Sequence, residues 1–281
     1  FDILDRTDYS LGMTHSPFAL ARTALHNASA VVLATGAGMG VDSGLPDFRG
    51  ATGFWKAYPM FERAGLRFHD LATPHLFETD PTLAWGFYGH RFNLYRDTVP
   101  HEGHAALLRA IGNRPSFAYT SNVDGQLLKA GWSPKRLVEC HGRIRAFQCL
   151  ADCGEPIWDA SDTRIEVDPT TCRAVGELPT CPSCGGLARP NILMFMDGEW
   201  DGAGTDLQHE LFENWWFSQN PKRVVVIECG AGTAIPSVRR FSEQLQREGA
   251  TLIRINPRES EGPRGTLSLP CGAAEGLHLI A

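Results

Sequence analysis

The sequence lacks any long apolar run. No stretch of about 18 or more uncharged apolar residues occurs among its 281 residues, and the first thirty hold no apolar core followed by a small-residue cleavage site. We therefore expect a cytosolic protein with no membrane partner. A basic stripe is also missing, because 26 Lys and Arg residues are scattered among 32 Asp and Glu residues and leave a net charge of −6. This balance argues against a role that depends on binding nucleic acid.

Four short apolar runs punctuate the chain, each followed by glycine, proline or a polar cluster. They span residues 30–35, 117–120, 223–228 and 251–256. Between them lie helix-length segments with apolar residues spaced three and four apart, at residues 19–26, 105–111 and 238–248. Buried strands that alternate with helices indicate an α/β fold, in which a Rossmann-like parallel sheet carries helices on both faces.

Two stretches interrupt this alternation. Residues 50–101 are rich in aromatic side chains and predict a helical insertion. Residues 149–187 carry two cysteine pairs among many Asp, Thr and Pro residues, without a long apolar period. They predict a small module that needs a cross-link, such as a bound metal ion, to stay folded. We thus expect a Rossmann-like domain of residues 1–148 and 188–281 with a zinc-binding module of residues 149–187 inserted.

The cysteine spacing carries the zinc prediction. Cys149 and Cys153 form one short pair, and Cys181 and Cys184 form the other. Thiolates at such spacing can converge on one tetrahedral zinc ion, which then supplies the folding free energy of a polar module. Cys172 is a competing ligand, and four reduced cysteines without metal are the plain alternative.

A glycine turn follows the first apolar run. Gly36, Ala37 and Gly38 allow backbone N–H groups to approach a pyrophosphate, although such a turn also serves simple strand-to-helix packing. The string that follows, Ser43 to Gly50, places a carboxylate, a ring and a guanidinium on one loop: Asp47, Phe48 and Arg49. A surface ion pair of Asp47 with Arg49 is the simpler interpretation.

Together these strings resemble the signature of the sirtuins, including those of bacterial type. The matching strings are Gly36-Ala37-Gly38, Ser43 to Arg49, Thr120-Ser121-Asn122-Val123-Asp124-Gly125 and Glu139-Cys140-His141-Gly142. They occur in the family's order, with the cysteine pairs after them and Ile255-Asn256 near the end of a match over residues 30–257. The resemblance implies an NAD-dependent enzyme that removes acyl groups from protein lysine, transfers them to ADP-ribose and releases nicotinamide.

The resemblance also assigns residues. His141 is implied as the general base, and Asn122 and Asp124 as the groups that hold ribose and nicotinamide. Asp47, Phe48 and Arg49 then form a loop over the cofactor. The implied cofactor-binding residues are Gly36, Ala37, Gly38, Asp47, Phe48, Arg49, Ser121, Asn122, Asp124, Gly230 and Asn256. Ser121 departs from the Gln that is usual in the family.

Two features concern the substrate. Tyr88 and Arg91 lie three residues apart, which places them on one face of a predicted helix. This pair is similar to the Tyr-x-x-Arg element of the sirtuins that remove succinyl and malonyl groups, although an Arg whose stem packs beside a core Tyr is the alternative. Phe195 lies in a segment that resembles the family's peptide-binding strand, in which Met196 and Asp197 replace the usual Gly and Glu.

Two other functions use the same residues. Ser121 and Met196-Asp197 leave room for an NAD-dependent protein ADP-ribosyltransferase or an NAD hydrolase. A non-catalytic module that senses NAD or binds a partner is the third hypothesis, and an intact His141 argues against it because binding alone needs no base.

Overall fold

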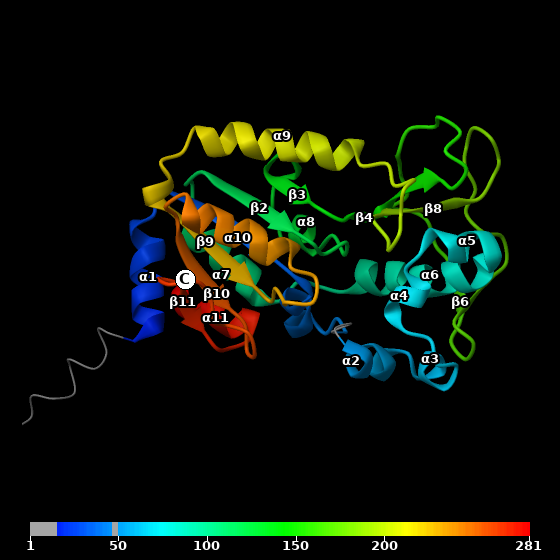
Figure 1. Ribbon diagram of the computed structural model, residues 1–281, viewed down its shortest axis with the longest axis horizontal. Coiled ribbons are helices and arrows are strands. Elements are labelled where there is room, and N and C mark those ends of the chain that lie inside the picture. Colours follow the sequence, from blue (N-terminus) through cyan, green and yellow to red (C-terminus); the bar gives the residue numbers. More distant parts are fainter. Residues whose placement is uncertain (1–15, 47–49) are drawn as a thin grey trace, which may run out of the picture. The chain divides into compact units, whose positions relative to one another are not determined.

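A computed structural model describes residues 16–46 and 50–281, which form two compact units (Figure 1). The first unit comprises residues 16–42, His101–Tyr119 and Glu213–Ala281, and the second comprises Ser43–Pro100 and Thr120–Phe212. The domain boundaries predicted from the sequence, at residues 149 and 187, remain a prediction. Among the helices of the described residues, none is long and apolar enough to cross a membrane.

The first unit is built on a parallel sheet. Its strands follow the order β11-β10-β9-β1-β2, and their bounds are β1 Ala30–Thr35, β2 Ser116–Thr120, β9 Val224–Cys229, β10 Thr251–Ile255 and β11 Leu267–Leu269. The pairings of β1 with β9, β9 with β10 and β10 with β11 are parallel. Every residue of β1 and β9 is buried, as expected for a parallel strand covered on both faces. The four predicted strands are confirmed, whereas β11 is only three residues long and gives no run to detect.

Helices cover this sheet in the described part of the unit. They are α1 Pro17–Asn27, α7 Glu102–Ile111, α10 Ser237–Arg247 and α11 Ala273–Ile280. α10 packs on β9, β10 and β1, while α7 and α1 pack on α11. The predicted helices of this unit are confirmed, and the first begins earlier than its apolar pattern because the Ser16 hydroxyl caps it by accepting from the Ala19 N–H at 3.1 Å.

The aromatic-rich insertion forms a helical lobe in the second unit. Its helices are α2 Gly50–Ala57, α3 Pro59–Arg63, α4 Phe68–Leu71, α5 Pro74–Thr79 and α6 Pro81–Asp97. The lobe shares one apolar core with strands of the same unit, and Phe54, Trp85, Phe87 and Phe147 are buried within it. The predicted helical insertion is confirmed.

The remaining strands of the second unit are short. β5 Trp158–Asp159, β4 Gly142–Cys149 and β8 Ala188–Ile192 form an antiparallel sheet in that order, and β6 Glu166–Asp168 pairs with β7 Arg173–Val175. α8 Gln126–Lys129 and β3 Leu137–Glu139 precede them, and α9 Ala203–Phe217 follows.

Helix α6 lies close to the segment that leads into β7. A Cβ atom at Gly86 would lie 2.0 Å from the carbonyl oxygen of Cys172, so this position accepts only glycine. The close contact fixes the helix that carries Tyr88 and Arg91.

Candidate functional site

In the first unit, two glycine turns meet at the carboxyl ends of adjacent strands. The N–H of Gly36 donates to the carbonyl of Cys229 and that of Gly38 to the carbonyl of Gly230, both at 3.0 Å. A Cβ atom at Gly38 would lie 2.7 Å from the Gly230 Cα atom, so the two turns touch backbone to backbone. Ala37 begins the 3₁₀ turn Ala37–Ser43 that follows β1. Such side-chain-free turns after parallel strands fit the pyrophosphate of a dinucleotide.

Asn256 joins the next strand to this group. It follows β10, its Nδ2 atom donates to the carbonyl of Ala231 at 2.9 Å, and its Oδ1 atom accepts from the N–H groups of Arg258 and Glu259. The Gly230 N–H in turn donates to the Ile255 carbonyl at 3.0 Å. The predicted residues Gly36, Gly38, Gly230 and Asn256 therefore lie together. Their cofactor contacts remain predictions.

The loop predicted to cover the cofactor lies outside the described residues. Asp47, Phe48 and Arg49 keep the roles expected of them from the sequence.

In the second unit, Ser121, Asn122 and Asp124 follow the end of β2. The Asn122 N–H donates to the Thr120 hydroxyl at 2.9 Å, and the Asp124 carboxylate accepts from the Gln126 N–H at 2.9 Å, at the start of α8. Burial raises the pKa of the Asp124 carboxyl to about 6, and Glu139 adds to this rise while Arg91 and Lys129 oppose it. At neutral pH, Asp124 is therefore still largely an anion.

His141 lies on the turn between β3 and β4. The preceding N–H, that of Cys140, donates to the Thr120 carbonyl at 2.9 Å, and the carbonyl of His141 accepts from the Leu193 N–H at 3.0 Å. Burial lowers the pKa of the His141 imidazole, and a hydrogen bond with the Ser121 backbone acts in the opposite direction. The imidazole is thus neutral at physiological pH, as a general base requires. The structure also brings His141 and Ser121 together from separate motifs.

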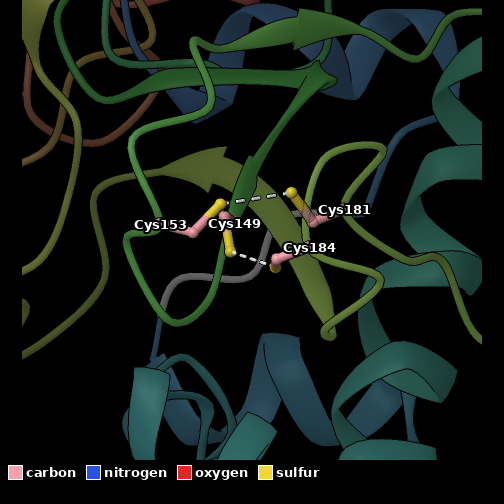
Figure 2. Close-up of side chains that lie close together, drawn as sticks. All are labelled: Cys149, Cys153, Cys181 and Cys184. Carbon is pink, nitrogen blue, oxygen red and sulfur yellow. Dashed lines mark hydrogen bonds between the residues drawn. The ribbon is translucent and has the colours of Figure 1, made fainter.

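The two cysteine pairs converge in the second unit (Figure 2). The four Sγ atoms of Cys149, Cys153, Cys181 and Cys184 all lie within 4.8 Å of one another, and the Cys149–Cys184 and Cys153–Cys181 pairs are each separated by 3.6 Å. Tetrahedral thiolates at the usual Zn–S length of about 2.3 Å lie about 3.8 Å apart, so this set fits one structural zinc ion. When bound, the ion joins β4 to the segment before β8.

Cys172 is not in this group. It is 3% exposed and packs in the aromatic core of the helical lobe. The four predicted cysteines therefore form the set that fits the metal, without the competing ligand.

Tyr88 and Arg91 are both carried by α6 and are both buried, at 1% and 7% exposure. The guanidinium carbon of Arg91 lies 5.5 Å from the ring centroid of Tyr88 and 5.2 Å from that of Phe87. The helix and the shared face are confirmed. The guanidinium of Arg91 is buried, and its binding of an acyl carboxylate remains a prediction.

The segment predicted to bind peptide continues from β8. The Phe195 N–H donates to the Ala72 carbonyl at 2.9 Å, and its ring packs edge-on against Phe68 with centroids 6.1 Å apart. Phe195 is 39% exposed, so part of its ring remains available to a ligand. Its contact with substrate remains a prediction.

The structure shows the backbone conformation at one departure in this segment and the partner of the other. Met196 has φ +55°, a left-handed conformation that suits the glycine usual in the family. Asp197 forms an ion pair with Arg189, in which Nη1 lies 2.9 Å from Oδ1, and both side chains are shielded from solvent. Asp197 thus provides a buried carboxylate that holds the segment.

Some supporting contacts give no signal in the sequence. Glu139 forms two hydrogen bonds with Arg145 at 2.7 and 2.8 Å, and its backbone is held by Gln208 and Thr205 of α9. These contacts position the turn that carries His141. Their partners lie up to 69 residues away, so no local pattern reveals them.

Comparison with known proteins agrees with this geometry. Residues 36–214 match the model of the Sir2 family. An NAD-dependent protein deacylase of Thermus thermophilus is 31% identical over 270 residues, which cover 92% of each chain. NAD-dependent protein deacylase sirtuin-5, mitochondrial, of Danio rerio is 35% identical over 243 residues, covering 80% of this chain and 73% of the relative. A solved Sir2 homologue in complex with NAD is 25% identical, has a TM-score of 0.69, and covers 92% of this chain and 91% of its own. The chain belongs to the Sir2 family.

Proposed function

We propose that this protein removes acyl groups from lysine side chains of proteins, with NAD as the co-substrate. The relatives named NAD-dependent protein deacylase support this activity over most of the chain. The observation that carries it is the 3.0 Å hydrogen bond from the Leu193 N–H to the His141 carbonyl. This bond supports the proposal because it links His141, the proposed base, to the segment in which an acylated peptide would add as a strand.

The residues of the second unit divide the chemistry among them. When bound, NAD supplies a ribose carbon that the acyl oxygen of the substrate attacks as nicotinamide leaves. Asn122 and Asp124 hold the ribose and the nicotinamide amide through their amide and carboxylate groups. His141, being neutral, would accept the proton of a ribose hydroxyl. That hydroxyl oxygen would then be a better nucleophile toward the carbonyl carbon of the acyl group.

The acyl chain that fits Arg91 ends in a carboxylate. A guanidinium and a phenol in an apolar lobe bind a carboxylate through charge-assisted hydrogen bonds, and that carboxylate offsets the charge of the buried Arg91. We therefore propose succinyl-lysine and malonyl-lysine as substrates alongside acetyl-lysine. The resemblance of Tyr88 and Arg91 to the Tyr-x-x-Arg element of the sirtuins that remove succinyl and malonyl groups supports this assignment.

The test pairs two peptides of the same sequence, one carrying succinyl-lysine and one acetyl-lysine. With NAD, we expect release of nicotinamide together with O-acyl-ADP-ribose, and loss of product in the His141→Ala variant. Arg91→Met should lose most activity on the succinyl peptide and keep activity on the acetyl peptide. Equal losses on both peptides would contradict the acyl assignment, and nicotinamide release without any acyl peptide would favour an NAD hydrolase.

We also infer a cytoplasmic location. Four of the eight cysteines, Cys149, Cys153, Cys181 and Cys184, are reduced and form the set that fits zinc. Such thiols persist in a reducing compartment, whereas an oxidising one favours disulfides. Cell fractionation with compartment markers tests this location.

A further inference from the structure

Arg91 is held on one side by Tyr95, one helical turn further along α6. The Nε–H of Arg91 donates to the Tyr95 hydroxyl at 3.0 Å, and the guanidinium carbon lies 5.4 Å from the Tyr95 ring centroid. The same residue thus contacts the guanidinium through its ring and through its hydroxyl. A bond at Nε fixes the rotation of the guanidinium plane and does not use the two terminal Nη groups that a carboxylate binds in a bidentate manner.

The backbone of Tyr95 is itself held by two hydrogen bonds. Its backbone carbonyl accepts from Lys129 Nζ at 2.7 Å and from Gln126 Nε2 at 3.3 Å. Both donors belong to α8, which begins two residues after Asp124. Tyr95 therefore links Arg91 to α8, the helix that directly follows the loop with Asp124, a predicted catalytic residue.

The surroundings of Arg91 explain why orientation matters there. Ring faces of Phe68, Phe87 and Tyr88 lie 5.2 to 5.6 Å from its guanidinium carbon. Ring faces attract a cation but do not select one direction for its N–H groups. The hydrogen bond with Tyr95 supplies that direction.

We propose that Tyr95 is a positioning residue for acyl selection, which orients Arg91 toward the carboxylate of an acidic acyl chain without touching the substrate itself. This inference rests on the proposed function, in which Arg91 binds that carboxylate. A pre-oriented arginine loses less rotational freedom when the substrate binds, so the contribution falls on affinity for acidic acyl chains. Acetyl-lysine has no carboxylate and gains nothing from it.

The test is the Tyr95→Phe variant, which keeps the ring face and removes only the hydroxyl. We expect KM for the succinyl peptide to rise about three- to tenfold with little change in kcat, because Arg91 is no longer held in the orientation that binds the carboxylate. Both constants for the acetyl peptide should stay at the wild-type values. The acetyl reaction also shows that the variant is folded.

Two further variants separate the possible results. Tyr119→Phe removes a hydroxyl from a ring that stacks on Phe241 in the first unit, and it should leave both peptides unaffected. In the Arg91→Met background, Tyr95→Phe should cause no further loss, because the group that it orients is absent.

The failures are distinct. If Arg91→Met leaves the ratio of succinyl to acetyl activity unchanged, the proposed acyl preference is wrong. If Arg91→Met changes that ratio while Tyr95→Phe keeps the wild-type ratio, or lowers both activities equally, the role of Tyr95 is overturned and the preference stands.

Discussion

Arg189 and Asp197 form an ion pair that is shielded from solvent on both sides. The exposed fractions of the two side chains are 1% and 0%, and Asp197 also accepts from the Met194 N–H at 3.1 Å. Arg189 donates in addition to the carbonyl of Ile192 at 2.9 Å. The pair therefore links the two ends of the stretch from Arg189 to Asp197. The conformation of this stretch depends on a carboxylate at position 197.

Removing that carboxylate should destabilise the second unit. Asp197→Asn leaves the Arg189 charge buried and unpaired, and we expect a loss of about 3–5 kcal/mol in the free energy of unfolding, measured in urea. Arg173→Gln provides the control, because it breaks the ion pair of Arg173 with Asp80, whose side chains are 45% and 32% exposed. That loss should stay below about 1 kcal/mol. Equal losses would contradict the structural role of the buried pair.

Metal content should depend on the four converged cysteines. Cys181→Ser removes one thiolate from the set, so we expect the zinc bound after dialysis to fall from about one ion per chain toward zero, with loss of the folded second unit. Cys172→Ala should keep its zinc, because Cys172 packs in the aromatic core. Metal analysis of both variants measures this. If only the Cys172→Ala variant lost its zinc, Cys172 and not Cys181 would be a zinc ligand.

The decrease of kcat/KM at low pH should follow the protonation of the His141 imidazole. Since burial lowers the pKa of His141, the base stays deprotonated until the pH falls below its usual value of about 6.5. We expect the half-maximal kcat/KM on the acid side near or below pH 6.5, measured with a saturating concentration of NAD. A limb centred above pH 7 would show that another group controls the proton transfer.

The ionised Asp124 should lower the free energy of unfolding at neutral pH. Because its pKa is raised to about 6, the folded state holds a proton that the unfolded chain has already released, so stability falls as the pH rises from about 4 to about 6. Asp124→Asn should remove this fall and raise the free energy of unfolding by about 1–3 kcal/mol at pH 7.5, with no gain at pH 4. The same variant should lose deacylation.

The control for Asp124 is a carboxylate with the opposite shift. Hydrogen bonds from Thr170 and Thr171 lower the pKa of Asp168, which is half-buried at the surface. Asp168→Asn should therefore give no gain in stability at pH 7.5. A gain in both variants would point to net charge rather than to the burial of Asp124.

The sequence alone determined the parallel sheet and which residues lie at its strand ends. Runs such as residues 30–35 and 223–228 identify buried strands because a strand covered on both faces needs apolar side chains throughout. The spacing of the cysteine pairs likewise predicted the zinc set, since two thiolates a few residues apart already share a direction. His141 and the Tyr88–Arg91 pair also followed from local strings.

Tertiary structure alone decided which residues support those groups. The pairing of Arg189 with Asp197 and the exclusion of Cys172 from the metal set depend on how the chain folds back on itself. An ion pair or a hydrogen bond requires an approach of about 3 Å, and no periodicity of the chain encodes such an approach between distant segments. Short strands such as β11 were missed for the same reason, because their stability comes from the neighbouring strand rather than from their own residues.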